Sequence, residues 1–168
     1  VVDNLFDIKP KGNNLDYQMW IVKYPYGDVV RKIPILSQAA KEKIETELQN
    51  ADFGTLPVAF GIAREPTYLW SPNGRYLAFS AAIDDSQVRI YLYDTQEDTI
   101  RRITNENHDA VIWSWSPDSQ WVVYREATEY YDDYMFSFRN VGVWAVSITG
   151  ESKFLYEPVG SEVMDTWV

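Results

Sequence analysis

Two ten-residue segments of this chain share one arrangement of turn residues and apolar residues. Residues 70–79 read WSPNGRYLAF, and residues 115–124, 45 positions later, read WSPDSQWVVY. In each, proline presets φ for a turn and Asn or Asp suits the next position, so one strand ends and another returns. Gly74 tolerates the exit of the first turn, whereas Ser119 predicts a second turn with a conformation open to other residues. Self-similarity at roughly 40–50 residues predicts an array of supersecondary units.

The strands that leave these turns are apolar on both faces. Tyr76 and Ala78 alternate with Leu77 and Phe79, so each pair lies on its own face of the strand. The second copy repeats this pattern with Trp121 and Val123 on one face, and Val122 and Tyr124 on the other. An exposed hairpin would alternate apolar with polar residues. The pattern therefore predicts a sheet packed between neighbouring sheets.

Two further strands follow in each unit, separated by a polar turn. We expect them at residues 88–94 and 99–104 in the first unit, and at 141–147 and 152–156 in the second. Residues 19–23 and 29–35 repeat the pattern of the third and fourth strands, and residues 162–167 repeat the approach to Trp70 and Trp115. Four antiparallel strands per unit predict a meander. We therefore predict an all-β fold of β-propeller-type blades.

This register predicts one domain, residues 1–168, that forms an incomplete propeller with two full blades and partial blades at both ends. The segments are a half blade at 19–36, a helical insertion and connection at 37–63, blades at 64–104 and 105–156, and the first strand of a further blade at 157–168. The single inserted helix is expected at 37–51, and residues 55–62 are expected to return to the sheet as an apolar connection. In the helix Ser37 is the predicted N-cap, and the apolar stripe is Ala40, Ile44, Leu48 and Ala51. This helix either caps the core or docks a partner.

The ring is incomplete, because a closed propeller has roughly four to eight blades. Three interpretations remain: the chain is part of a longer protein, it self-associates through open blade edges, or it is a small open stack of sheets. The residues expected on the two open ends are apolar: Met19, Trp20 and Ile21 at one end, and Val163, Trp167 and Val168 at the other. Exposed, such faces would aggregate.

The second unit has eight more residues than the first between its second and third strands. This segment, residues 125–140, is either an extended hairpin whose rings pack on a neighbouring blade, or an aromatic platform flanked by carboxylates for a peptide, a sugar or a cationic group. In a meander the loops after strands two and four lie at one end, so the helix, this loop, Asp84-Asp85 and His108 are expected to share a face. The predicted binding residues are His108, Glu129, Tyr130, Tyr131, Asp132, Asp133, Tyr134 and Phe136.

The repeated turn, its apolar return strand, the IYLYD strand and the RRIT exit resemble the repeat of TolB-like β-propellers. They also resemble the propellers that precede the hydrolase domain in prolyl-oligopeptidase-family peptidases. The resemblance covers residues 64–156, extends to 19–36 and 162–168, and is absent from 1–17 and 37–63. It implies a non-catalytic module outside the cytoplasm, periplasmic or secreted, that recognises a protein, peptide or glycan. The alternative is the propeller portion of a serine peptidase whose catalytic domain is not in this chain; a third is a structural repeat without a ligand.

Composition removes several classes of function. A net charge of −10 argues against a nucleic-acid binder, because phosphate affinity comes from clustered Lys and Arg. With no cysteine and a single histidine, His108, we expect neither disulfides nor a metal site, and His108 is expected on a surface loop. The Asp84-Asp85 and Asp132-Asp133 pairs lack calcium-loop spacing and are expected in solvated turns.

Other functional signals are missing from the sequence. No nucleophile elbow, catalytic triad or phosphate loop can be assembled, so we expect no cofactor and no catalysis within the chain. No apolar run approaches the roughly 20 residues of a membrane span. The chain opens Val1-Val2-Asp3 without Met, which favours a processed or excised stretch whose targeting signal is gone.

Overall fold

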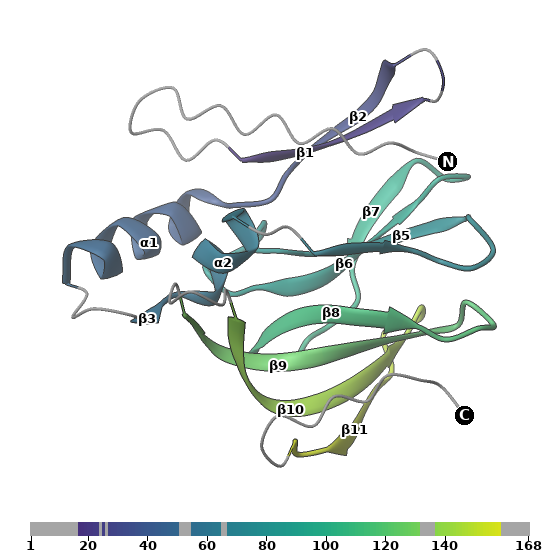
Figure 1. Ribbon diagram of the computed structural model, residues 1–168. Helices are drawn as coiled ribbons and strands as arrows, with labels where there is room; N and C mark the ends of the chain where they lie inside the picture. The colour runs from purple at the N-terminus through teal and green to yellow at the C-terminus, as the bar shows by residue number, and fades with distance from the viewer. Residues whose placement is uncertain are drawn as a thin grey trace.

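The structure, a computed structural model, describes residues 17–23, 25, 27–50, 55–64, 67–131 and 137–158. These residues form a mostly β fold with two four-stranded antiparallel sheets, a two-stranded hairpin and two short helices (Figure 1). The hairpin and the segment that follows it are β1 (Gln18–Lys23), β2 (Asp28–Pro34), α1 (Gln38–Asn50), β3 (Thr55–Leu56) and α2 (Val58–Arg64). The prediction of a fold built mainly from antiparallel β-strands is confirmed.

The two sheets correspond to the two predicted repeat units. The first sheet has the strand order β4 (Tyr68–Trp70), β5 (Tyr76–Ala81), β6 (Arg89–Asp94) and β7 (Thr99–Arg102). The second sheet contains β8 (Asp109–Trp115), β9 (Trp121–Tyr131), β10 (Ser137–Ser147) and β11 (Ser152–Tyr156), and β3 pairs with β9 beyond the start of β8. All of these pairings are antiparallel, so the predicted four-stranded meander is confirmed in both units.

The hairpin, the first sheet and the second sheet are stacked as three layers (Figure 1). Leu77 and Phe79 belong to the cluster that faces the hairpin, whereas Tyr76 and Ala78 face the second sheet. In the second sheet Val122 and Tyr124 face the first sheet, and Val123 lies in a separate cluster on the far side. The predicted division of apolar residues between two faces is therefore confirmed, and the first sheet lies between two layers as predicted. In the described ranges a neighbouring sheet covers the second sheet only on the side of the first.

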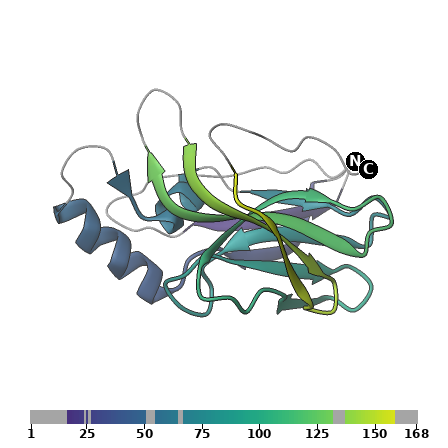
Figure 2. The same cartoon turned by 90° about the horizontal axis from the view of Figure 1, so that it is seen from below.

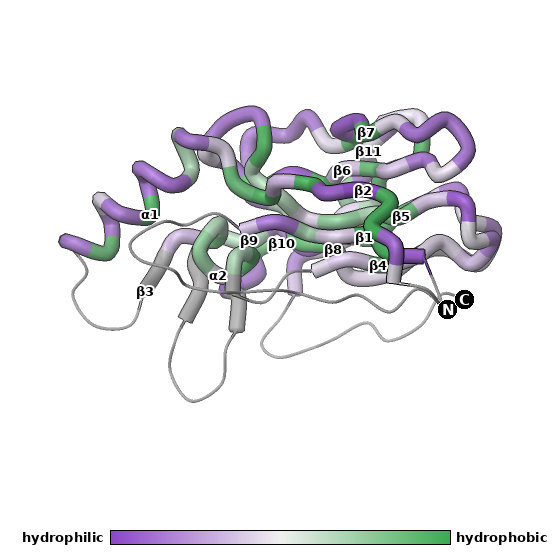
Figure 3. The backbone as a smooth tube through the Cα atoms, turned by 90° about the horizontal axis from the view of Figure 1, so that it is seen from above, coloured by the Kyte–Doolittle hydropathy of each residue, from purple (hydrophilic) through white to green (hydrophobic). Residues whose placement is uncertain are grey.

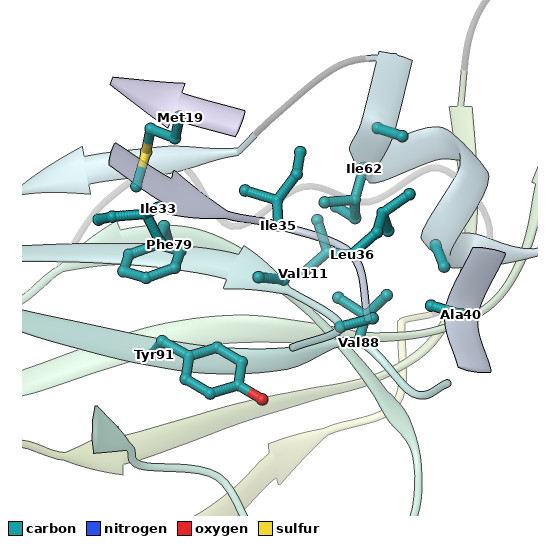
Figure 4. Close-up of a cluster of buried hydrophobic side chains, with 14 of the residues drawn as sticks. Met19, Ile33, Ile35, Leu36, Ala40, Ile62, Phe79, Val88, Tyr91 and Val111 are labelled. Carbon is teal, nitrogen blue, oxygen red and sulfur yellow. The ribbon is translucent and has the colours of Figure 1, made fainter. Parts of the chain in front are cut away.

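The core between the hairpin and the first sheet is completed by the segment that leads into α1. Figure 4 shows Met19 and Ile33 of the hairpin above Phe79, with Ile35 and Leu36 continuing the apolar layer toward α2. Backbone hydrogen bonds tie this segment to the loop after β5, because the N–H of Ala82 donates to the carbonyl of Ile35 (2.8 Å) and the N–H of Ser37 donates to the carbonyl of Ala82 (2.5 Å). The hairpin layer is thus attached through both side chains and backbone.

Helix α1 begins as predicted and is amphipathic over its first two turns. The Ser37 hydroxyl accepts a hydrogen bond from the Ala40 N–H (3.1 Å), which is the N-cap geometry. Ala40 and Ile44 are fully buried, but Leu48 is 44% exposed, so the predicted apolar stripe is wrong at that position; Ala51 lies outside the described residues. Figure 3 shows the hydrophilic character of most of this helix. None of the helices in the described ranges is both long enough and apolar enough to cross a membrane.

The prediction of a single helix is wrong, because α2 forms where an apolar connection was expected. Its residues Val58, Ala59, Ile62 and Ala63 are each at most 2% exposed. Pro57 stands immediately before the helix, where its missing N–H costs nothing, and its carbonyl accepts from the Phe60 N–H (2.9 Å). A short apolar run fits a buried strand and a buried helix equally well by periodicity. Because α2 is buried on both sides, its sequence lacks the alternation of apolar and polar residues that distinguishes a helix from a strand.

The two repeated turns are built by the same hydrogen bonds. The Ser71 hydroxyl accepts from the Tyr76 N–H and donates to the Asn73 side chain, and Ser116 does the same with the Trp121 N–H and Asp118. Gly74 has a φ of 72° and Ser119 a φ of 61°, so the prediction of a different backbone conformation at Ser119 is wrong. The Ser119 hydroxyl accepts from the Asn73 N–H of the other turn (3.1 Å), and this bond between the sheets offsets the left-handed strain.

Substitution of Ser119 separates the hydrogen bond from the backbone strain. We expect Ser119→Ala to lose about 1 kcal/mol of unfolding free energy, because it removes the bond to Asn73 and keeps the left-handed conformation. Ser119→Gly loses the same bond but relieves about 1 kcal/mol of strain, so its stability should stay near that of the parent. Urea denaturation measures both, and equal losses in the two variants would contradict the assignment.

The apolar residues that the sequence placed on the first open end of the stack are covered in the structure. Met19 and Ile21 were expected on an open face but are 2% and 5% exposed, because they pack inward on the first sheet. Trp20 lies on the opposite side of β1 with the Lys32 ammonium 4.2 Å from its ring centroid. On the second sheet Lys153 covers Trp121 in the same way at 4.5 Å. The residues predicted at the other open end, Val163, Trp167 and Val168, lie outside the described residues.

Candidate binding site

The two ends of the sheets differ in construction. The turn end, residues 71–75, 95–98, 116–120 and 148–151, consists of short turns. The opposite end is called the hairpin end here, after the β9–β10 hairpin and not after the β1–β2 hairpin of the outer layer. It carries the start of α1, the 82–88 connection, the 103–108 connection and the distal part of the β9–β10 hairpin (Figure 2). At this end the Ser37 hydroxyl donates to the carbonyl of Asp85 (2.5 Å), and β3 pairs with Tyr130 and Tyr131 of β9. The prediction that the helix and the 125–140 segment share one end is confirmed.

Most of the segment predicted as a loop after residue 124 is strand. β9 and β10 continue past the end of β8 and pair from Trp121 with Ser147 out to Tyr131 with Ser137, with register shifts around Asn140. The segment is thus an extended β-hairpin, and whether its aromatic rings pack on a neighbouring sheet or form a platform depends on side chains outside the described residues. The backbones of Glu129, Tyr130 and Tyr131 belong to β9. The other predicted site residues of the β9–β10 hairpin lie outside the described residues: Asp132, Asp133, Tyr134 and Phe136.

His108 is not the surface loop residue that the sequence indicated, because its side chain is only 14% exposed. Its ring lies 5.0 Å from the Trp144 ring and 6.0 Å from the Tyr124 ring, measured between centroids. The Nδ1 atom is 3.8 Å from Oε1 of Glu126, whose Oε2 accepts a hydrogen bond from the Trp144 indole (3.0 Å). The Nε2 atom is buried without a hydrogen-bond partner. His108 therefore anchors the 103–108 connection to the inner face of the second sheet.

This environment favours the neutral imidazole. Burial lowers the pKa of His108 below its ordinary range, and the carboxylates of Glu126 and Glu106 offset part of that effect. The Arg89 guanidinium acts in the same direction as burial, and Asp109 acts against it. The pKa of Asp109 is itself raised, chiefly by burial, against the hydrogen bond that its carboxylate accepts from the Val88 N–H (2.6 Å). The pKa of His108 is thus set by burial and Arg89, which lower it, against three carboxylates, which raise it.

Acid should destabilise this part of the fold. Because the pKa of His108 is lower in the folded chain, the unfolded chain binds more protons below a pH of about 6.5, and folding stability falls as pH decreases through that window. His108 is the only histidine, so its Hε1 resonance reports its pKa directly by NMR. We expect a midpoint below about 6.5 that Glu126→Gln lowers further, since that variant removes the main charge favouring protonation. A midpoint at or above the ordinary value would contradict this account.

Arg89 and Asp109 connect the two sheets beside His108. Arg89 is 5% exposed, and its Nη1 donates to the carbonyl of His108 (2.7 Å). Next to it the Ala110 N–H donates to the carbonyl of Val88 (2.9 Å). The start of β6 and the start of β8 are therefore joined at the hairpin end by backbone and side-chain hydrogen bonds.

Each carboxylate of the acidic pair Asp84-Asp85 has a partner within the first sheet or its connections. Asp84 lies 3.5 Å from the Arg102 guanidinium, and the Asp85 carboxylate accepts from the Gln87 N–H (2.7 Å). Across the described ranges no group of three or more His, Asp or Glu side chains is arranged to hold a metal ion.

Sequence reasoning identified His108 but missed the residues around it. Tyr124 was predicted on a covered face of its strand, Trp144 lay within the strand expected at 141–147, and Glu126 lay inside the predicted loop. Their association with His108 depends on the pairing of Trp144 with Tyr124 and of Gly142 with Glu126 across β9 and β10. Only Gly142 carried a signal in the sequence, because a glycine inside an expected strand indicates a close approach of another group. In the structure a Cβ at this position would lie 2.8 Å from the Glu126 carboxylate.

No protein-family model matches this chain, and no curated protein matches it, so the hairpin end is interpreted from its own geometry.

Proposed function

We propose that this chain forms consecutive blades of a β-propeller and serves as a non-catalytic binding module that recognises a peptide segment of a protein partner at its hairpin end. Three features support the propeller part of the proposal. The two sheets have the same strand order, their first turns use the same hydrogen bonds, and each sheet packs its face on the next. TolB-like propellers, which this repeat resembles, make an extracytoplasmic location the accompanying proposal.

The observation that carries the proposal is the difference between the two ends. At the turn end the two units are alike in length and hydrogen bonding. At the hairpin end the chain adds α1, α2 and β3 before the first sheet, and the β9–β10 hairpin (residues 121–147) is eight residues longer than the β5–β6 hairpin (residues 76–94). A repeated scaffold with variable insertions at one end is the usual way in which such folds carry a binding site.

A peptide fits this end better than a glycan because β10 has an open edge there. β11 pairs with β10 only from Val143 to Val146. No strand in the described ranges pairs with residues 140–142 on that edge, and Val141 is 37% exposed. The backbone groups of an open edge can bind an extended peptide as an added strand, and a neighbouring exposed apolar side chain adds contact area.

Selection from a random peptide library displayed on phage, in parallel with a glycan array, tests the proposal on the purified chain. We expect peptides to be selected and Val141→Arg to weaken them by about tenfold or more in calorimetric titrations, because it places a charge in the contact. The matched control is Val30→Arg, an exposed valine of β2 that is 55% accessible and lies away from the hairpin end. Equal losses in both variants would overturn the hairpin end as the site, and glycans alone would overturn the peptide.

A further inference from the structure

Arg89 is a buried cation held only by neutral acceptors. Its Nη2 donates to the side-chain oxygen of Gln87, and its Nη1 donates to the carbonyl of His108 (2.7 Å) and, at 3.5 Å, to that of Val88. The Nε atom is buried with no hydrogen-bond partner. No ion pair joins Arg89 to a carboxylate within the part of the chain that the structure describes.

This arrangement is unusual for a chain with a net charge of −10. Removing a guanidinium from water is costly, and buried charges in proteins are normally paired. Asp109, the carboxylate at the start of the adjoining β8, binds the Val88 N–H instead. Two other arginines of the first sheet have carboxylate partners, since Arg75 pairs with Asp94 (2.7 Å) and Arg102 with Asp84. Arg101 donates to the carbonyl of Ile148, but unlike Arg89 it is exposed to water.

Gln87 occupies the position in which a carboxylate would be expected. Its amide oxygen accepts from Nη2, and its side chain, unlike that of Arg89, is partly exposed. A carboxamide and a carboxylate have nearly the same shape, and the guanidinium is a donor fork that fits a carboxylate. The Gln87 side chain can leave by rotation about its own bonds, without movement of either sheet.

We propose that Arg89 binds a carboxylate of the partner, which displaces the Gln87 side chain; this inference rests on the proposed function of the hairpin end as a peptide-binding site. The carboxylate comes either from a free peptide C-terminus or from an Asp or Glu side chain. A planar monoanion matches the space that the Gln87 amide fills. The negative charge of the chain, including Asp85, Asp109 and Glu126 at this end, disfavours multivalent anions such as phosphate esters.

The test uses small carboxylates as probes and NMR of the Arg89 side chain as the readout. Sodium acetate is titrated into the full chain at pH 7.5 against sodium chloride of equal ionic strength, with the Arg89 Nε–Hε and His108 Hε1 resonances observed. We expect a saturable shift with acetate and none with chloride. Gln87→Ala should tighten acetate binding at least threefold because the competing amide is removed. Gln87→Glu should abolish binding and raise the melting temperature, since the new carboxylate pairs with Arg89 inside the chain.

Gln96→Ala and Gln96→Glu at the turn end are the matched controls and should leave both the acetate titration and the melting temperature unchanged. N-acetyl-diglycine and N-acetyl-aspartate N-methylamide then distinguish a C-terminal carboxylate from a side-chain carboxylate. If the acetate-induced shift fails to saturate in the parent and also fails to saturate in Gln87→Ala, the inference is overturned. So does a Gln87→Glu variant that binds acetate as the parent does.

These outcomes are separable from failure of the proposed function. If library peptides bind the hairpin end and lose affinity in Val141→Arg but bind Gln87→Glu normally, the module stands and the carboxylate inference is wrong. If acetate binds as expected while no peptide is selected, the carboxylate site stands and the peptide function fails.

Discussion

Phe79→Ala should remove a large part of the folding stability of this chain. Phe79 is 1% exposed, lies between the hairpin layer and the first sheet, and stacks on Tyr91 with ring centroids 5.8 Å apart (Figure 4). Deleting a fully buried phenyl ring costs about 3–5 kcal/mol, the sum of lost transfer free energy and the cavity that remains. A domain of this size has a total stability of about 5–15 kcal/mol. Urea denaturation followed by tryptophan fluorescence measures the loss.

Phe154→Ala is the matched control, because Phe154 is 50% exposed and touches Trp144 through an edge-to-face contact. Its substitution should cost about 1 kcal/mol, in proportion to the area that is buried. If Phe79→Ala does not fold, Phe79→Leu gives the same comparison, since it keeps most of the volume and should be destabilised by less. Similar losses for Phe79→Ala and Phe154→Ala would show that the hairpin layer does not cover the first sheet.

Ser80→Ala should destabilise the fold more than a one-atom deletion suggests, by about 1–3 kcal/mol. The Ser80 hydroxyl on β5 accepts a hydrogen bond from the Ile112 N–H on β8 (2.9 Å), and both residues are buried. Without it a buried backbone donor between the sheets loses its acceptor, and water cannot enter to replace it. Thermal and urea denaturation of the variant give the loss directly.

Ser86→Ala provides the reference for this measurement, because Ser86 lies partly exposed in the connection after β5. It should change the unfolding free energy by less than about 0.5 kcal/mol, as most surface substitutions do. A Ser80→Ala variant that is no less stable than Ser86→Ala would mean that the two sheets are not joined by this bond.

The strands were predictable because the repeat supplies two independent copies of the same pattern. The strands expected to leave the two repeated turns are β5 and β9, the strand expected at 152–156 coincides with β11, and the N-cap at Ser37 was predicted from its side-chain chemistry. α2 was missed since residues 58–63 form a short apolar run that is mostly buried, and such a run has no period that distinguishes a helix from a strand. Ser119 was misjudged because the hydrogen bond that offsets its left-handed strain is made with the turn of the other sheet.

The candidate site was predictable in position and not in chemistry. Alternation of loops in a meander places α1, His108 and the β9–β10 hairpin at one end from strand order alone. The burial of His108 against Trp144 and its approach to Glu126 require the register of β9 with β10, which the bulges around Asn140 shift. Arg89 was predicted only as a strand residue, because its lack of a carboxylate partner depends on which residues the packed sheets bring next to it.

The amino-acid sequence by itself determined the strands, their turns and the two apolar faces of each sheet, because backbone propensity and side-chain alternation act over a few neighbouring residues. Tertiary structure alone decided which charges are paired and which polar atoms lose water. Those properties depend on residues far apart in the chain, such as Arg89 and His108 or Ser80 and Ile112, whose distance is set only when the layers pack.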